Sequence, residues 1–399
     1  MKHGNLVIGQ SGGPTSVINS SLAGVIEAAL ESGSFDRVLG MNFGIEGLME
    51  ERFFDLGKQG REVIRGLRST PGSALSSSRH KLQEEDFPRI LEVLKKYDIR
   101  VFMLIGGNDT MDTVHRVEAH CRKAGYELRG IGIPKTVDND LFGTDHTPGF
   151  ASAARSNILN VRQGGVLARD MRRVDQFVVY QTIGRDAGWL AAATALARQQ
   201  EGDGPHLIYM PERRFTTERF IADAEAAYAA HGWVSVVCGE GITYPDGMPV
   251  SASKTQDRFS NTEFGAMGGA SVALQLHRML REHFGWRGEF QITESLIMSD
   301  AARREEQDAQ EAYECGRKAV SLALDGVSGV MVSIQRVSDN PYSIELGTAA
   351  LEDVAVRAKP MPDTFINETG NYPSQAFIDY CTPLISALPE FTRLEDKMV

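Results

Sequence analysis

Short apolar runs that end in glycine or in a polar turn recur along the chain. They predict strands over residues 6–8, 101–105, 131–133, 177–180, 207–210 and 233–237. Apolar runs without polar alternation are typical of strands that are covered on both faces, as in parallel sheets. The pattern therefore predicts an α/β protein with doubly wound, mostly parallel open sheets.

Helical spacing of apolar residues follows several of these strands and predicts helices over residues 17–31, 109–123 and 186–199. In sheets of this kind, ligands bind beyond the carboxyl ends of the strands. We therefore expect one cleft to be lined by the loops that begin at Gly12, Gly106, Lys135 and Gly184.

The composition is that of an ordinary globular protein, with 42% hydrophobic and 24% charged residues in a chain of 399. This length suggests two or three domains. The net charge of −11 argues against nucleic-acid and membrane partners. No apolar run suits a membrane span, and the N-terminal residues lack the apolar segment of a secretory signal, so we expect a cytoplasmic protein. Four scattered cysteines without CxxC spacing predict free thiols.

The loop after the first predicted strand contains Gly12 and Gly13 at the start of a helix. Glycines there let backbone N–H groups approach an oxyanion at the helix N-terminus, although a plain turn has the same pattern. The loop matches neither the Walker sequence nor the dinucleotide fingerprint. The missing fingerprint counts against a nicotinamide-dependent oxidoreductase.

The second loop, GGNDT at residues 106–110, places Asp109 at the start of the next predicted helix. A carboxylate there caps the helix or, beside a phosphate, binds Mg²⁺. The sequence leaves both interpretations open.

The third loop, PKTVDND at residues 134–140, carries the strongest signal. Lys135 can hold a phosphoryl group. Asp138 and Asp140 lie two residues apart, so they can share one face of an extended segment. One carboxylate could then accept a hydroxyl proton while the other helps to hold metal or to orient the first.

The second and third loops together resemble the bacterial type of the phosphofructokinase family, particularly its pyrophosphate-dependent branch. Further segments resemble the family in the same order: residues 11–13, 72–75 with Arg79, 143–150, 183–185, 211–212 and 361–366. The resemblance implies Mg²⁺-dependent, reversible transfer of a phosphoryl group from pyrophosphate to the C1 hydroxyl of fructose 6-phosphate. The products would be fructose 1,6-bisphosphate and phosphate.

The resemblance also implies a role for each site residue. Asp138 would be the general base, Lys135 and Arg79 would stabilise the transferring phosphoryl group, and Asp109 would hold Mg²⁺. The donor phosphates would contact Gly12, Gly13, Gly107, Asn108 and Thr110. The acceptor would contact Thr136, Asp140, Gly184, Arg185 and Glu212.

Two residues indicate which donor is used, because ATP-dependent relatives have glycine where this chain has Asp109 and Lys135. An aspartate in the donor cleft would crowd and repel the α-phosphate of a nucleotide, whereas pyrophosphate ends before that point. The cationic Lys135 could hold pyrophosphate or the departing phosphate.

The chain departs from the family where arginines hold the 6-phosphate of the acceptor. Met298 and Gln176 stand at those positions in an ungapped register, and methionine cannot replace a bidentate arginine. Three interpretations remain. Other arginines could supply the charge: Arg303 with Arg304, Arg287, or Arg172 with Arg173. The acceptor could instead be a different sugar or polyol, or the chain could be a non-catalytic sensor of pyrophosphate or sugar phosphate.

The resemblance further implies two similar α/β domains with the active site in the cleft between them, and a homodimer or homotetramer. We expect residues 1–148 with 297–350 to bind the donor, and residues 149–296 with 351–399 to bind the acceptor. Two local features favour structural interpretations: residues 301–308 as a solvated helix start, and His146 as a structural histidine.

Overall fold

The computed structural model describes residues 4–251 and 270–394. It divides into two compact units, each made of two chain segments. Unit 1 comprises Met1–Ser156 and Glu294–Met361, and unit 2 comprises Asn157–Thr293 and Pro362–Val399.

Unit 1 is built on a seven-stranded sheet. In sheet order, its strands are β11 (Tyr342–Ala350), β10 (Val330–Asp339), β5 (Arg129–Pro134), β4 (Ile99–Gly106), β1 (Asn5–Gln10), β2 (Val38–Met41) and β3 (Phe53–Asp55). The five inner strands run parallel, whereas β3 and β11 pair antiparallel at the edges. The inner strands are apolar on both faces because helices cover both sides.

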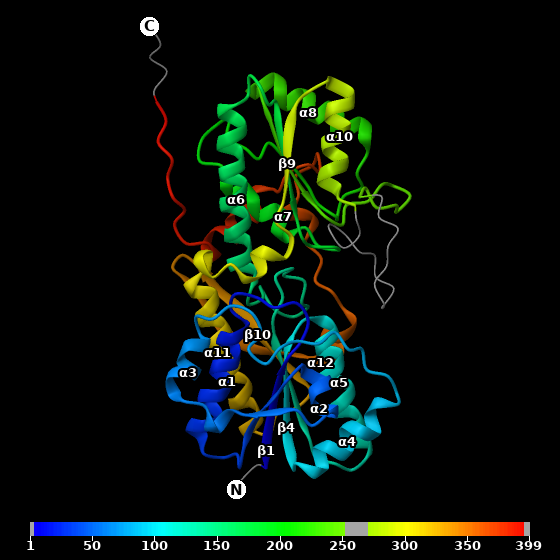
Figure 1. Cartoon of the computed structure of the whole chain (residues 1–399), viewed down its shortest axis with the longest axis vertical. Coiled ribbons are helices and arrows are strands. Elements are labelled where there is room, and N and C mark those ends of the chain that lie inside the picture. The colour runs from blue at the N-terminus through cyan, green and yellow to red at the C-terminus, as the bar shows by residue number, and fades with distance from the viewer. Residues whose placement is uncertain (1–3, 252–269, 395–399) are drawn as a thin grey trace. The chain divides into compact units, whose positions relative to one another are not determined.

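Figure 1 shows these two helical layers in unit 1. One face carries α1 (Ile18–Ser32), α3 (Arg61–Leu67) and α11 (Glu306–Leu324). The other carries α2 (Gly44–Met49), α4 (Asp86–Lys96), α5 (Asn108–Lys123) and α12 (Leu351–Val356). Alternate residues of β1 serve the two cores, with Leu6 and Ile8 packing in one and Val7 in the other.

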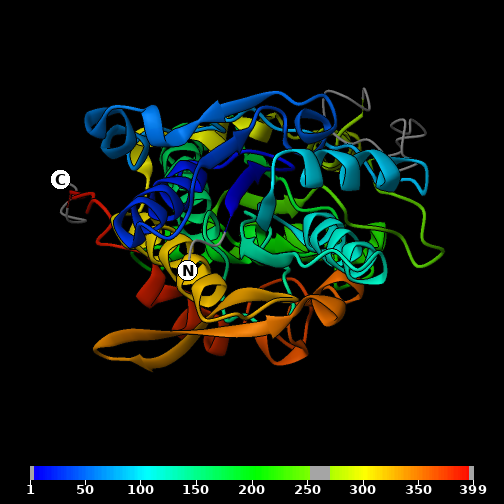
Figure 2. The ribbon, with the colours of Figure 1, turned by 90° about the horizontal axis from the view of Figure 1, so that it is seen from below.

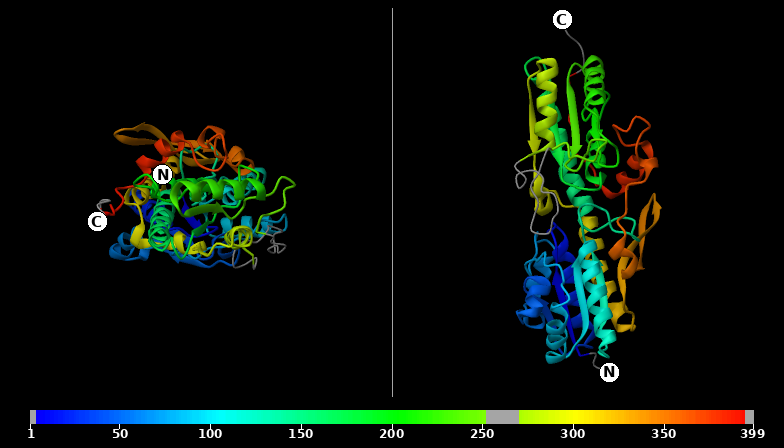
Figure 3. Two further views of the ribbon diagram at one scale, coloured as in Figure 1. Left: turned by 90° about the horizontal axis from the view of Figure 1, so that it is seen from above. Right: turned by 90° about the vertical axis from the view of Figure 1, so that its right-hand side faces the viewer.

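A long antiparallel hairpin of β10 and β11 forms one edge of this sheet, as Figures 2 and 3 show. The first residues of β10 pair with β5, where Val330 lies beside Ile131. Further along, β10 is paired only with β11 among the described strands, and buried residues give way to an alternation of half-buried and exposed ones. The sequence analysis missed this hairpin because its distal half has no continuous apolar run.

Unit 2 contains a four-stranded parallel sheet. In sheet order, its strands are β7 (Leu207–Tyr209), β8 (Val234–Gly239), β6 (Phe177–Thr182) and β9 (Gly288–Ile292). The helices α8 (Thr217–His231) and α10 (Val272–Phe284) pack on one face. The helix α6 (Phe150–Asp170), which begins in unit 1, packs on the other face through Ala168.

The short helices and turns complete the two units. They are α7 (Trp189–Ala193), α13 (Gln375–Cys381) and the 3₁₀ turns η1 (Leu56–Lys58), η2 (Thr194–Ala197), η3 (Glu294–Ser299), η4 (Ala301–Arg303), η5 (Asp363–Phe365) and η6 (Thr382–Leu384). All six predicted strands are present, which confirms the fold class. The predicted helix over 186–199 is wrong in extent, because the residues before Trp189 form a loop that carboxylates of unit 2 hold.

The remaining expectations on the chain as a whole concern membranes and thiols. Among the described residues, no helix is both long and apolar enough to cross a membrane. The predicted free thiols are confirmed, and all four cysteines are buried.

Candidate active site

Three of the predicted loops meet at one end of the unit 1 sheet. They follow β1, β4 and β5, which are adjacent parallel strands, so their carboxyl ends lie side by side. The fourth predicted loop, after β6, belongs to unit 2.

Lys135 links the third loop to the first. Its side chain is almost completely buried, and Nζ donates a hydrogen bond of 2.7 Å to the carbonyl of Gly13. Gly12 has φ +76°, a backbone conformation that favours glycine. A Cβ at this position would also stand only 3.2 Å from Nζ of Lys135, so a larger residue would crowd the lysine. Burial lowers the pKa of Lys135 to about 8, which Asp138 and Asp140 oppose.

The segment that carries Arg79 runs beside the first loop. Gly12 N donates to the carbonyl of Ser78 at 3.2 Å, and the Ser77 hydroxyl donates to the carbonyl of Gly12 at 2.6 Å. The Arg79 side chain is exposed. The sequence therefore brings an arginine to the first loop from a segment about 65 residues further along the chain.

The second loop opens α5. A Cβ on Gly106 would clash with Thr110, which explains the glycine at the end of β4. Asp109 lies exposed in the first helical turn, and no described side chain caps this helix. The structure therefore gives Asp109 no capping role.

Asn108 connects the second loop to the third, because its Nδ2 donates to Oδ2 of Asp140 at 3.4 Å. Its Oδ1 is buried and finds no hydrogen-bond partner among the described residues. This acceptor precedes the exposed Asp109 in the chain, and carboxylate and amide oxygens are ligands that suit a hard divalent cation.

Among the described residues, no group of three or more His, Cys, Asp or Glu side chains could by itself hold a metal ion. Mg²⁺ bound to phosphates needs only one or two carboxylates, and phosphate oxygens and water complete its coordination. The oxygens of Asp109 and Asn108 fit that kind of site.

Hydrogen bonds hold the third loop in its conformation. Asp138 N donates to the Thr136 hydroxyl at 3.1 Å, and the Thr147 hydroxyl donates to the carbonyl of Thr136 at 2.8 Å. Asn139 is buried with φ +56°, a conformation that asparagine adopts more readily than most residues. Asp138 and Asp140 are half-buried on either side of it.

In unit 2, two carboxylates hold the loop after β6. Gly184, with φ +121°, donates from N to Oε1 of Glu240 at 3.2 Å, and Gly188 N donates to Oε1 of Glu212 at 2.8 Å. The Arg185 side chain is exposed. The sequence analysis missed Glu240, although its place between two glycines at the carboxyl end of β8 was the available signal.

A model of the family described as phosphofructokinase matches residues 5–323. The chain belongs to the phosphofructokinase family. It is 37% identical over 392 residues to an enzyme of Halomonas elongata named pyrophosphate–fructose 6-phosphate 1-phosphotransferase, an alignment that covers 96% of this chain and 92% of the relative. It is 34% identical over 369 residues to a sulfofructose kinase of Alkalicoccus urumqiensis, covering 92% and 93%.

The comparison with solved structures supports the same family. The pyrophosphate-dependent phosphofructokinase of Nitrosospira multiformis superposes with a TM-score of 0.88 at 34% identity, covering 99% of this chain and 94% of that one. The chain is therefore a phosphotransferase with the two-domain fold that the resemblance implied.

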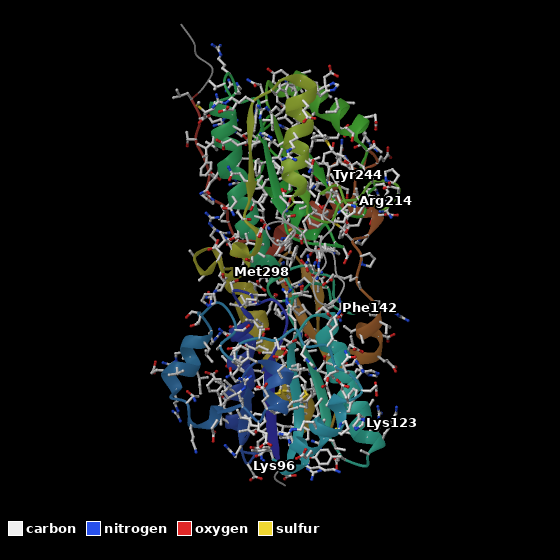
Figure 4. The ribbon with its side chains drawn as sticks, turned by 45° about the vertical axis from the view of Figure 1, so that its right-hand side comes forward. Lys96, Lys123, Phe142, Arg214, Tyr244 and Met298 are labelled. Carbon is white, nitrogen blue, oxygen red and sulfur yellow. The ribbon has the colours of Figure 1, made fainter. Side chains whose placement is uncertain are left out.

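Met298, which the ungapped register predicts to stand at a family arginine position, lies in η3 of unit 1 and is labelled in Figure 4. Its terminal methyl lies over Gly13, because a Cβ on Gly13 would stand 2.5 Å from Cε. The second departure, Gln176, precedes β6 and bonds to the backbone of Arg287. It therefore lies at the opposite end of β6 from Arg185.

The arginines that could replace the missing charge have other contacts. Nε of Arg303 lies 3.7 Å from Oδ2 of Asp300. The guanidinium of Arg304 donates hydrogen bonds to the carbonyl of Arg68 and to the carboxylate of Glu306. In unit 2, Arg287 pairs with Asp175 at 2.9 Å, and Arg172 donates to the carbonyl of Arg169.

The expectation of a solvated helix start over residues 301–308 is wrong in part: Ala301, Ala302 and Glu306 are exposed, but Glu305 and Asp308 are buried. The helix begins at Glu306, and Asp308 is 1% exposed. Its carboxylate accepts from Gly149 N at 2.8 Å and from the N and hydroxyl of Ser152 at 3.0 and 2.6 Å. Asp308 thus caps the start of α6, and burial raises its pKa to about 6.

His146 has the structural role that was expected of it. The ring is fully buried, with Nδ1 2.7 Å from Asp145 and Nε2 2.6 Å from Glu311. Burial opposes its protonation, but the two carboxylates raise the pKa of His146. The pairing ties the residues after the third loop to α11.

Proposed function

We propose that the protein transfers a phosphoryl group from pyrophosphate to the C1 hydroxyl of fructose 6-phosphate, reversibly and with Mg²⁺. The observation that carries the proposal is the buried ammonium of Lys135, held between the first and third loops at the carboxyl ends of β1 and β5. The names of several near full-length relatives support the same donor and acceptor.

Each loop of unit 1 has a part in the proposed mechanism. Asp138 accepts the proton of the acceptor hydroxyl, and Thr136 and Asp140 orient the acceptor. Lys135 and Arg79 neutralise charge that develops on the transferring group. Backbone groups of Gly12, Gly13 and Gly107, with Thr110 and Asn108, hold the donor.

The metal ion would be held by Asp109, with the free oxygen of Asn108 beside it. When bound, Mg²⁺ supplies positive charge that neutralises the phosphate oxygens of the donor. The same Asp109 disfavours ATP, because a nucleotide would bring its α-phosphate towards a carboxylate in the first turn of α5.

In unit 2, we propose that Gly184, Arg185 and Glu212 contact the acceptor. The hydrogen bond from Gly188 to Glu212 supports a role for this carboxylate in shaping the loop. Unit 1 would thus bind mainly the donor and unit 2 the acceptor. A homodimer or homotetramer in the cytoplasm remains our expectation.

A second candidate acceptor is a sugar without a 6-phosphate, and Met298 favours it. A thioether gives no grip on a phosphate dianion, and Arg303 and Arg304 already contact other groups. The relative named sulfofructose kinase supports a fructose that carries a sulfo group as acceptor.

The deciding experiment is phosphoryl transfer by the purified protein with Mg²⁺. Fructose 6-phosphate is offered with pyrophosphate and with ATP in parallel, and fructose 1,6-bisphosphate is detected directly. We expect product with pyrophosphate only. Product with ATP only would contradict the roles of Asp109 and Lys135.

A second panel separates the acceptors. It offers pyrophosphate with fructose, with 6-sulfofructose and with polyols of similar length. Faster turnover of any of these than of fructose 6-phosphate would establish the second candidate. Pyrophosphate binding by folded protein, without turnover of any acceptor, would indicate a sensor.

A further inference from the structure

The residues after α12 form an extended segment, residues 357–361, which we call the strap. The strap lies against the third loop although more than 200 residues separate them in the chain. Lys359 N donates to the carbonyl of Asp140 at 2.7 Å, and Leu141 and Ala358 form an antiparallel bridge. The loop that carries Asp138 and Asp140 is therefore paired with the strap through its backbone.

The side chain of Lys359 binds the same stretch of chain at three further points. Its Nζ donates to Oδ1 of Asn139 at 3.1 Å and to the carbonyls of Thr144 and Asp145 at 3.3 and 2.6 Å. One ammonium thus joins the residue next to Asp138 to the end of the following turn. Such a group restrains both ends of residues 139–145 at once.

A cation is needed for this arrangement because an ammonium has three donors and the three partners are all acceptors. A neutral side chain of similar length could not serve all of them. Burial lowers the pKa of Lys359 to about 7, and the carboxylates of Asp145 and Asp140 oppose that shift. Lys359 is therefore in its ammonium form, with all three donors, below about pH 7.

Asn139 shows what the restraint achieves. Its left-handed backbone turns the chain between Asp138 and Asp140, so the two carboxylates flank a fixed point. Asparagine visits this conformation at some cost, and surrounding contacts must hold it there. Lys359 supplies one contact to the Asn139 side chain.

We propose that Lys359 is a positioning residue that fixes the catalytic loop and thereby directs the Asp138 carboxylate at the acceptor hydroxyl. The proposal rests on the function proposed above, in which Asp138 is the general base. Lys359 itself touches neither donor nor acceptor in this mechanism, so its loss slows the chemical step and leaves substrate binding largely intact.

The test compares Lys359→Met with Lys123→Met in the full-length protein. Lys123 is an exposed lysine at the last turn of α5, at the opposite end of the unit 1 sheet from Met298 and Phe142 (Figure 4). We expect Lys359→Met to lower kcat about 100-fold, as a misplaced catalytic group does, with KM for both substrates changed less than about threefold. Lys123→Met should change neither.

A second readout does not depend on the reaction. Hydrogen–deuterium exchange should become at least about tenfold faster for amides of residues 137–145 in Lys359→Met, while amides of β4 stay protected. A kcat within about threefold of the unaltered protein, or unchanged exchange, would overturn the proposal. If the unaltered protein turns over no acceptor, the proposed function fails, and exchange alone decides whether Lys359 holds the loop.

Chemical rescue covers the case in which Lys359→Met folds poorly. Lys359→Ala is assayed with propylammonium and, as a neutral control, with propanol. Recovery of kcat with the amine alone supports a positioning cation. Equal effects of the two additives, or none, contradict it.

Discussion

The terminal methyl of Met298 lies directly over Gly13 in the first phosphate loop, with Cε 2.5 Å from the point where a Cβ on Gly13 would stand. The carbonyl of the same Gly13 accepts the hydrogen bond of Lys135. The position predicted to match a family arginine thus contacts the same glycine that binds the lysine we assign to the donor.

Gly13→Ala should therefore act through Met298. The new methyl group must displace the end of a flexible side chain, and we expect kcat/KM for pyrophosphate to fall about tenfold. Met298→Ala removes the obstacle, so the double variant should recover most of the loss, with a coupling energy of about 1 kcal/mol. Steady-state kinetics of the unaltered protein, the two single variants and the double variant measure this coupling energy. Gly66→Ala in α3 serves as control, because a Cβ there would contact no other atom.

Met298→Arg should add a grip on the 6-phosphate if this position matches the family arginine, as the ungapped register predicts. We expect KM for fructose 6-phosphate to fall about tenfold, because a guanidinium can bind a phosphate through two parallel hydrogen bonds. KM for unphosphorylated fructose should not fall. Leu296→Arg adds the same charge at an exposed neighbour, 74% exposed, and serves as control. Equal effects of the two variants would show that only net charge matters.

The pKa of Lys135, lowered by burial to about 8, sets an alkaline limit on activity. The ammonium is charged below that pH and loses its charge above it, so kcat/KM for pyrophosphate should decline as pH rises through about 8. Assays from pH 6.5 to 9.5 at saturating acceptor measure the decline. Lys135→Met should be about 10²-fold slower and lack this step. A decline of the same midpoint in Lys135→Met would assign it to another group.

His206 in unit 2 should make stability depend on acid. Burial, and then His231 stacked on it at 4.4 Å, lower the pKa of His206 to about 3, and its Nδ1 accepts from Ser235 N. Below about pH 6.5, His206 binds a proton in the unfolded chain but stays neutral in the folded protein. The free energy of unfolding should therefore fall by about 1.4 kcal/mol per pH unit between about 6.5 and 3.

Urea unfolding at several pH values measures this slope. His206→Gln, which keeps an acceptor for Ser235 N but does not titrate, should flatten it. The exposed His283→Gln should leave it unchanged. An unaltered slope in His206→Gln would contradict the assignment.

The sequence alone predicted the positions of the three loops of unit 1. Strands that are covered on both faces appear in the sequence as unbroken apolar runs, and each of these runs ends where its loop begins. The sequence was insufficient for Asp308, since a carboxylate in a charged run looks solvated until the start of α6 is placed against it. Lys359 was missed for the same reason. Its partners lie more than 200 residues away in the chain, and no local sequence pattern predicts these contacts.

Unit 1 cannot be completed until late in synthesis. The strand β5 acquires its neighbour β10 only after the whole first segment of unit 2 has been made, roughly 200 residues later in the chain. At about 5–20 residues per second, the ribosome leaves that edge unpaired for about 10–40 s. An apolar strand with free N–H and C=O groups is open to wrong pairing during this time. During synthesis, this edge of β5 is therefore exposed for longer than the edge that pairs with β4.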